Sequence, residues 1–183
     1  EIGRQLRKAF IPESKDCILV GADYSQIELR ILAHLSEDPA LITAFHKGAD
    51  IHRATAARVF GVAESEVTPI QRSNAKAVNF GVIDGMISFV LSSELNITKK
   101  KAELYIEEDV RKHAKVKEFM DQKVAECRKN GYVTTIVNRK RPIPEINASN
   151  YIQRQAGERL AMNSPIQGSA ADIIKMAMIR CHK

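Results

Sequence analysis

A carboxylate that follows a short apolar run is the first candidate for chemistry in this sequence. Asp23 comes directly after residues 17–22, which read CILVGA and are typical of a buried strand. Such a strand fixes the backbone and brings the next side chain to the edge of the core. Mg²⁺ prefers oxygen ligands and commonly takes one or two carboxylates together with phosphate oxygens. Asp23 is therefore a candidate metal ligand; the alternative is that it only caps the helix that follows.

A second candidate group consists of four residues that are each four positions apart, Arg72, Lys76, Phe80 and Asp84. On a helix of about 3.6 residues per turn they form one slowly drifting stripe. Two cations a turn apart can bind a triphosphate, and an aromatic ring one turn further can stack on a base or a ribose. The alternative is a solvated basic face with a partly buried phenylalanine. Gly81 in the same stretch indicates that another group approaches the helix closely.

Three further polar features are compatible with binding. Residues 138–141 read NRKR after a predicted strand and either contact a phosphate backbone or form an ordinary charged turn. Residues 158–168 place amides and a cation around a predicted helix break, where they reach base edges or sugars. The alternative there is helix capping by Asn163 and Ser164. His52 lies in the first turn of a predicted helix, where a lone histidine is either structural or functional.

Composition favours a compact chain with a polyanionic partner. The chain has 183 residues, of which 44% are hydrophobic, so one folded unit with a real core is expected. Aromatic residues make up 5% and tryptophan is absent, so aliphatic side chains must fill that core. The formal net charge of +6 suits nucleic acid or a nucleoside triphosphate.

Cysteine usage and hydropathy indicate an intracellular protein. Cys17, Cys127 and Cys181 are far apart and show no zinc-ligand spacing, which favours a reducing compartment. No apolar run approaches the roughly 20 residues that a transmembrane helix needs. The chain does not begin with Met, and its last apolar-periodic run has no stop signal, so we expect a piece of a longer protein.

The elements that must position these residues are mostly helices. Periodicity and capping signals predict helices at 27–35, 38–47, 51–60, 69–83, from Gly85 to about 95, 99–129, 149–162 and from about 168. Asp50 is the expected N-cap of the third, and Thr68 with Pro69 begins the fourth. Asn130 and Gly131 end the long helix that starts at Lys99.

The expected strands are few. Besides the run at 17–22, residues 132–137 read YVTTIV, and this β-branched stretch predicts a strand. Pro142 and Pro144 limit its partner to a short edge piece. The sequence therefore predicts an α+β fold that is predominantly helical.

Several stretches together resemble one family. DYSQIELR at 23–30 resembles motif A of family A (polymerase I type) DNA polymerases, and RSNAKAVNFG at 72–81 resembles their motif B. GADIHRATA at 48–56, GYVTTIVNRKR at 131–141 and ERLAMNSPIQGSAADIIK at 158–175 resemble further stretches of that family, in the same order. The resemblance covers nearly all of the chain.

The resemblance implies fingers helices flanked by a few palm strands of a right-hand polymerase fold. Residues 1–36 would be a palm segment with motif A, residues 37–150 the fingers with motif B, and residues 151–183 the return helices toward the palm. The implied partners are primer–template DNA and deoxynucleoside triphosphates, with no membrane and no obligate protein partner. The implied location is the bacterial cytoplasm, in association with the nucleoid.

The same resemblance implies template-directed DNA synthesis, in which a primer 3′-hydroxyl attacks the α-phosphate by a two-metal mechanism. Asp23 and the Tyr24 carbonyl would hold Mg²⁺, of which the complete enzyme uses two ions. Glu28 would be the steric gate against a ribose 2′-hydroxyl, and Lys76 could protonate the leaving pyrophosphate. The implied nucleotide-binding residues are Gln26, Glu28, His52, Arg72, Lys76, Phe80 and Asp84. The implied DNA-binding residues are Arg139, Arg141, Arg159, Asn163 and Gln167.

Two departures from the family pattern affect these expectations. Motif C, with the second metal aspartate, lies downstream of the equivalent of Lys183, and the thumb and exonuclease lie outside the chain, so we expect no primer extension by the chain alone. Asp172 is no substitute, since it belongs to the IQGSAAD helix. Asp84 stands where the family has Tyr; a carboxylate cannot stack on a template base, and near Glu28 it would impair fidelity or nucleotide binding.

Two other classes of function remain as alternatives. The first is a nucleic-acid-binding module that kept the basic surface and lost catalysis; the missing motif C and Asp84 favour it, whereas Asp23, Glu28 and the cations of the stripe argue against it. The second is a single-subunit RNA polymerase, which shares the motif logic, but a bulky gate at Glu28 would reject ribonucleotides.

Overall fold

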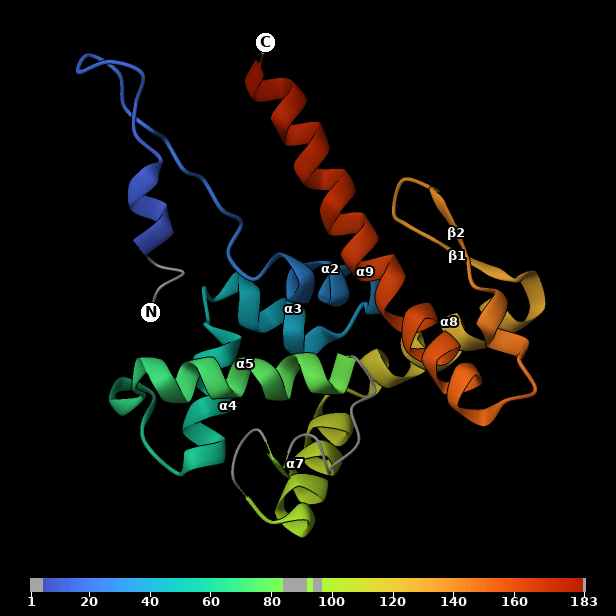
Figure 1. The fold of residues 1–183 in the computed structure, drawn as a ribbon. Helices are drawn as coiled ribbons and strands as arrows, with labels where there is room; N and C mark the ends of the chain where they lie inside the picture. Colours follow the sequence, from blue (N-terminus) through green and yellow to red (C-terminus); the bar gives the residue numbers. More distant parts are fainter. Residues whose placement is uncertain (1–4, 84–91, 94–96, 183) are drawn as a thin grey trace.

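The structure is a computed structural model that describes residues 5–83, 92–93 and 97–182. Figure 1 shows an assembly of helices with one small hairpin, so the prediction of a predominantly helical α+β fold is confirmed. The elements are η1 (Leu6–Ala9), α2 (Ile27–Ser36), α3 (Pro39–His46), α4 (Ile51–Phe60), η2 (Glu64–Glu66), α5 (Pro69–Ile83), α7 (Lys99–Lys112), α8 (Ala114–Asn130), β1 (Tyr132–Thr134), β2 (Lys140–Pro142), η3 (Pro144–Asn147) and α9 (Tyr151–His182). Among the described residues, none of the helices is both long and apolar enough to cross a membrane.

The helices between residues 27 and 83 begin close to the predicted positions, and two of them are capped by aspartate side chains. The Asp38 carboxylate accepts a hydrogen bond from the Leu41 N–H at 2.9 Å and so caps α3. Asp50 caps α4 in the same way through the Arg53 N–H, at 3.1 Å. The predictions of α2, α3, α4 and α5 are therefore confirmed in type and close to their observed bounds. The short helix predicted from Gly85 to about residue 95 lies outside the described residues, apart from residues 92–93.

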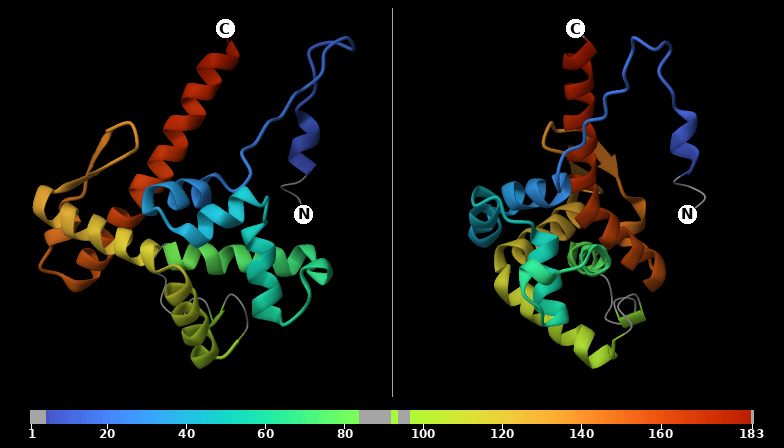
Figure 2. Two further views of the ribbon diagram at one scale, coloured as in Figure 1. Left: turned by 180° about the vertical axis from the view of Figure 1, so that it is seen from behind. Right: turned by 90° about the vertical axis from the view of Figure 1, so that its left-hand side faces the viewer.

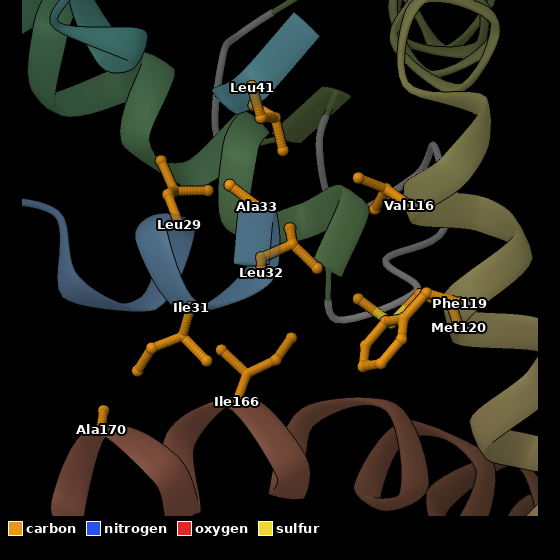
Figure 3. Close-up of a cluster of buried hydrophobic side chains, with 10 residues drawn as sticks. All are labelled: Leu29, Ile31, Leu32, Ala33, Leu41, Val116, Phe119, Met120, Ile166 and Ala170. Atoms are coloured by element: carbon orange, nitrogen blue, oxygen red, sulfur yellow. The ribbon is translucent and has the colours of Figure 1, made fainter. Parts of the chain in front are cut away.

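The main core surrounds α2, whose side chains meet those of α3, α8 and α9 (Figure 3). The buried members of this cluster are aliphatic apart from one phenylalanine, as the low aromatic content predicts: Leu29, Ile31, Leu32, Ala33, Leu41, Val116, Phe119, Met120, Ile166 and Ala170. Because α2 follows the segment with Asp23, this cluster fixes the helix that leads out of the candidate site.

The prediction of one helix over 99–129 is wrong, because the chain turns at His113 and forms α7 and α8. His113 has φ −117° and ψ 53°, outside the helical region. Its imidazole Nδ1 lies 3.2 Å from the buried carboxylate of Asp38. This contact and the packing of Val116 and Phe119 on the main core direct α8 against α2, so tertiary contacts outweigh the local helical preference.

The prediction of a helix break before residue 168 is also wrong, since α9 runs through Pro165 without interruption. A proline inside a helix removes one hydrogen bond and costs about 3 kcal/mol. Pro165 is fully buried, and the next turns place Ile166 and Ala170 in the main core. Burial of that apolar face, together with the hydrogen bond that Ser169 Oγ donates to the Pro165 carbonyl, offsets the local cost.

The prediction of a buried strand at 17–22 is wrong. Within the described residues this segment has no strand partner, and its side chains are exposed, with 82% of Ile18 and 83% of Val20 accessible. Figures 1 and 2 show it extending away from the helices, on the same side as the end of α9. A strand requires a neighbour for its N–H and C=O groups, and the apolar run alone supplies none.

The strand predicted at 132–137 is confirmed only for its first half. β1 pairs antiparallel with β2, with Val133 opposite Arg141, and β2 is the short edge piece that the two prolines predicted. Gly131 precedes the hairpin in the left-handed conformation, φ 78°, and ends α8 as expected. The base of the hairpin rests on a second apolar cluster that includes Cys127, Ile143 and Ile146.

Gly157 tests how closely α9 approaches η3. A Cβ at this position would lie 2.7 Å from the backbone nitrogen of Ile146 and 2.8 Å from the carbonyl carbon of Glu145. We predict that Gly157→Ala lowers the free energy of unfolding by about 2 to 3 kcal/mol, because backbone must move to relieve the overlap. Urea denaturation measures the change. Gly21→Ala is the control, because nothing lies within 4 Å of that Cβ; equal stability of the two variants would contradict the packing described.

Candidate functional site

An open cavity of about 520 Å³ lies where the segment before α2 meets α4 and α5. Its lining residues are Asp23, Tyr24, Ser25, Gln26, Ile27, Glu28, His52, Arg72 and Lys76. The residues predicted to bind nucleotide and metal thus surround one cavity, as far as their side chains are described. The side chain of Phe80, which belongs to α5, and the whole of Asp84 lie outside the described part of the chain.

The cations of α5 are one helical turn apart, and the first is held by an ion pair. Arg72 Nε donates to Asp50 Oδ2 at 2.7 Å, while the other carboxylate oxygen of Asp50 caps α4. Burial raises the pKa of Asp50, but the hydrogen bonds from Arg72 and from the Arg53 N–H outweigh burial and bring the pKa below its usual value. Asp50 therefore stays ionised and fixes Arg72 beside the start of α4.

Gln26 connects the segment that carries Asp23 to α4. Its backbone is left-handed, with φ 55°, a conformation that costs a residue with a side chain about 1 kcal/mol or more. Its side-chain Oε1 accepts a hydrogen bond from the Ile51 N–H at 3.1 Å, which satisfies one free donor at the start of α4. The backbone around Asp23 and Tyr24 is thereby anchored next to His52.

His52 is buried and belongs to a short polar chain between α4 and α5. Its Nδ1 lies 2.8 Å from the side-chain nitrogen of Asn79, and the Asn79 oxygen accepts from Thr55 Oγ1 at 2.9 Å. Burial, reinforced by Arg72 and Lys76 and opposed by Asp50, lowers the pKa of His52 to about 4. At neutral pH the imidazole is uncharged, so it can take part in binding only as a neutral donor or acceptor.

The cavity lining contains oxygen donors that could hold a metal ion only if other groups, such as phosphate oxygens, completed its coordination. Among the described residues, no three His, Cys, Asp or Glu side chains gather to hold a metal. Asp23 and Tyr24 line the cavity, and each has an oxygen donor, the Asp23 carboxylate and the Tyr24 carbonyl. Mg²⁺ commonly binds one or two carboxylates and completes its shell with water and substrate phosphates, so these donors fit magnesium better than zinc.

The predicted DNA-binding residues do not line this cavity, and Arg139 is tied to α9. Its Nε donates to Asp172 Oδ1 at 2.9 Å and its Nη2 to the Gly168 carbonyl at 3.1 Å. A hydrogen bond from Thr135 lowers the pKa of Asp172, as does Arg139, against the effect of burial. These bonds hold the hairpin loop against α9, so Arg139 has a structural role whatever else it contacts.

Because α9 is continuous, three other predicted DNA-binding residues share one stripe of the same helix. Arg159, Asn163 and Gln167 follow one another at intervals of four. Arg159 and Gln167 are exposed and Asn163 is half-buried. Arg141, in β2, is exposed on the hairpin. Two elements, α9 and the hairpin, thus carry the residues expected to contact DNA.

Sequence reasoning missed the polar partners that hold the site. Asp50 was expected only as a helix cap, and Thr55 and Asn79 were assigned no role. A signal existed in the spacing: Thr55 is three residues after His52, and Asn79 is three after Lys76, so each shares a helical face with a predicted binding residue. What the sequence could not show is that the two faces meet.

Two cations, a neutral imidazole and carboxylates surround one open cavity, an arrangement that is chemically suited to a polyanion. Residues 1–183 match the model of DNA polymerase family A. DNA polymerase I of Streptococcus pneumoniae serotype 4 is 53% identical over 184 residues, which is 100% of this chain and 21% of that protein. DNA polymerase I of Geobacillus stearothermophilus is 51% identical over 179 residues, 98% of this chain and 20% of that protein. The chain therefore belongs to DNA polymerase family A.

A solved structure agrees with this assignment. The POL domain of Pol1 from M. smegmatis, in complex with DNA primer-template and dNTP, is 45% identical, with a TM-score of 0.78 over 86% of this chain and 28% of that one. The chain spans about a fifth of the length of the curated relatives it matches.

Asp50 allows the ion pair and the helix cap to be separated. We predict that Asp50→Asn, which keeps a capping oxygen, lowers the free energy of unfolding by about 0.5 kcal/mol, and that Asp50→Ala lowers it by about 1.5 kcal/mol. Because the pKa of Asp50 is lowered by folding, the effect of Asp50→Asn should vanish as the pH falls through that value.

Urea denaturation at pH 7 and at about pH 3 measures both variants. Asp121→Asn is the control, because Asp121 forms an exposed ion pair with Lys117 on α8 and should cost little. Equal losses for Asp50→Asn and Asp50→Ala would show that the cap contributes nothing.

Proposed function

We propose that this chain supplies the nucleotide-binding part of a template-directed DNA polymerase, which transfers a deoxynucleotidyl group to a primer 3′-hydroxyl. The observation that carries the proposal is the gathering of Asp23, Glu28, His52, Arg72 and Lys76 around one cavity. Membership of DNA polymerase family A supports it, since the matched relatives are DNA polymerases I. The M. smegmatis neighbour, with DNA primer-template and dNTP, supports these two partners.

In this proposal each side chain of the cavity has a distinct task. Arg72 and Lys76 bind the triphosphate of the incoming nucleotide, with charge-assisted hydrogen bonds one helical turn apart. His52 adds a neutral contact to a phosphate oxygen, and Gln26 keeps the neighbouring backbone in place. Lys76, as an ammonium group, also donates a proton to the leaving pyrophosphate.

The remaining groups act at the sugar and at the reacting phosphate. Asp23 and the Tyr24 carbonyl would hold Mg²⁺, which when bound stabilises charge on the phosphate oxygens and on the attacking 3′-oxygen. Glu28, in the first turn of α2 and among the residues that line the cavity, excludes a ribose 2′-hydroxyl by its bulk. Phe80, from the stripe of α5, packs on the sugar and the base.

Primer and template would contact the surfaces outside the cavity. Arg159, Asn163 and Gln167 present one stripe of α9, and Arg139 and Arg141 present the hairpin. The net charge of +6 favours such contacts. In this assignment residues 1–36 belong to the palm, 37–150 to the fingers and 151–183 to the helix that returns to the palm, and the protein acts on DNA in the bacterial cytoplasm, at the nucleoid.

Nucleotide binding by the chain tests the proposal directly. Arg72→Ala and Lys76→Ala should each weaken binding of a deoxynucleoside triphosphate with Mg²⁺ by about tenfold, because each removes a charge-assisted hydrogen bond of about 1.5 kcal/mol or more. Isothermal titration calorimetry measures the dissociation constants. Lys117→Ala removes an equal charge on α8, from a residue that does not line the cavity, and controls for long-range electrostatics. If all three substitutions weakened nucleotide binding equally, the binding would be a nonspecific electrostatic attraction and the cavity would have no specific role in it.

The gate is tested in a chimera in which this chain replaces the matching fifth of the DNA polymerase I of Bacillus subtilis, which is 51% identical over 179 residues. We predict that Glu28→Ala in the chimera raises incorporation of ribonucleotides relative to deoxynucleotides by more than tenfold, since the bulk that excludes the 2′-hydroxyl is gone. Primer extension with single nucleotides measures the ratio. The chimera with an unaltered Glu28 is the control, and an unchanged ratio would remove the gate from the proposal.

Asp84 is tested in the same chimera. Because the family has a tyrosine at this position and a carboxylate cannot stack on a template base, we predict that Asp84→Tyr lowers misinsertion or tightens nucleotide binding severalfold. Single-turnover incorporation of correct and incorrect nucleotides measures both. Identical values before and after the substitution would show that the aspartate causes no defect.

A further inference from the structure

A buried polar chain behind the cavity contains two side chains, Thr55 and Asn79, that have no part in the roles proposed above. It consists of Thr55 from α4, Asn79 from α5 and the imidazole of His52, again from α4. All three residues are nearly inaccessible, with 6%, 6% and 3% of their surface exposed. Buried polar groups are costly unless they are paired, so a chain of three in the contact between two helices must satisfy a specific arrangement of donors and acceptors.

The distances assign that arrangement. Thr55 Oγ1 donates to the Asn79 oxygen at 2.9 Å, which orients the amide with its NH₂ group toward His52. This NH₂ group lies 2.8 Å from His52 Nδ1, which must then be the acceptor. A neutral imidazole has one acceptor and one donor nitrogen, so the proton of His52 is on Nε2.

We propose that Thr55 and Asn79 are positioning residues for the incoming nucleotide: they hold His52 as an Nε2–H donor for a phosphate oxygen. This inference rests on the proposed function, because it requires a phosphate in the cavity. It goes beyond that function by assigning the tautomer of His52 and the two side chains that set it.

The surroundings of the imidazole explain why a neutral donor is useful. Arg72 and Lys76 already supply positive charge at this cavity, and both disfavour a third cation. Asp50, the acidic group that acts on His52 in the opposite sense, is neutralised by its ion pair with Arg72. A neutral Nε2–H adds a hydrogen bond to a phosphate without a change of charge across the physiological pH range.

The hydrogen-bonded chain of Thr55, Asn79 and His52 also connects α4 to α5, the two helices that carry proposed binding residues. Asn79 lies on the same helix as Arg72 and Lys76, two turns and one turn further along. The Thr55–Asn79–His52 bonds and the Asp50–Arg72 ion pair therefore join α4 to α5 at two levels. Any displacement of α5 toward a triphosphate carries His52 with it, so the imidazole and the two cations reach the phosphates together.

The side chains of Thr55 and Asn79 can be substituted without overpacking the protein interior. Thr55 and Asn79 also line a separate, mainly apolar cavity of about 270 Å³ between α4 and the main core. Thr55→Val keeps the volume and removes the hydroxyl donor, while Thr55→Ser keeps the donor. Asn79→Asp keeps the shape but offers only acceptor oxygens when ionised, so it requires a proton on Nδ1.

The first arm of the test observes the imidazole itself. The protein is labelled with nitrogen-15 at its histidines, and the His52 signal is assigned as the one that disappears in His52→Gln. Nitrogen NMR should then show His52 in the Nε2–H tautomer, with no titration from about pH 8 to pH 5.5. In Asn79→Asp the His52 signal should move to a form with a proton on Nδ1 and should titrate in that range. A wild-type signal with the proton on Nδ1, which is what a reversed amide gives, would overturn the inference, as would an unchanged signal in Asn79→Asp.

The second arm measures binding of a deoxynucleoside triphosphate with Mg²⁺ by the same variants. Thr55→Val and Asn79→Asp should raise the dissociation constant about threefold to tenfold, with a new pH dependence for Asn79→Asp, whereas Thr55→Ser should match the wild type. Circular dichroism and thermal unfolding confirm that each variant is folded.

The two arms separate the inference from the function on which it rests. A wild-type chain that binds no nucleotide, with His52 in the Nε2–H form, would contradict the proposed function and the phosphate contact that rests on it, but not the tautomer or the two side chains that set it. A wild-type chain that binds nucleotide with the same affinity and pH profile as Asn79→Asp and Thr55→Val would contradict the positioning role and leave the function intact.

Discussion

The contact between α4 and α5 is the constraint on which the candidate site depends. α5 carries Arg72 and Lys76, α4 carries His52, and neither helix alone could hold these groups around one cavity. Small residues permit a close approach of the two helices, since Ala56 and Ala75 are fully buried where they meet. At that separation short polar side chains can bridge the helices, and a single carboxylate, Asp50, both caps α4 and binds Arg72.

Around this contact the helices form two groups. α4, α5 and α7 contact one another in sequence, whereas α2, α3, α8 and α9 surround the main core. Asp23 precedes α2 and Glu28 is in α2, whereas the cations of the cavity are on α5. The opposing charges of the site thus come from different groups of helices, and the cavity lies where these groups meet. The width of the cavity depends on how the two groups of helices are placed relative to each other. The buried aliphatic core shared by α2, α3, α8 and α9 helps to define that placement.

Local signals in the sequence were sufficient for most helices and for the stripe on α5. Asp50, Thr68 and Gly131 mark helix ends through hydrogen bonds or backbone angles that involve only near neighbours, so a sequence reveals them. The errors occurred where distant residues decide. Pro165 remains helical because its neighbours are buried against α2, and the segment around Ile18 forms no strand because no described segment pairs with it. The ion pair of Asp50 with Arg72 spans 22 positions, and no local pattern predicts it.

The same dependence on distant contacts determines how the helices are connected to one another. Gln26 holds the segment before α2 to the first N–H of α4, and Asp38 holds the turn before α3 to His113 at the start of α8. Both contacts are made by side chains at helix ends, where backbone groups lack partners within the helix. A movement of α5 together with α4 would act on the bond between Gln26 and Ile51 and on the packing of Ile51 against the main core. That bond therefore links the position of the cations to the backbone that carries Asp23.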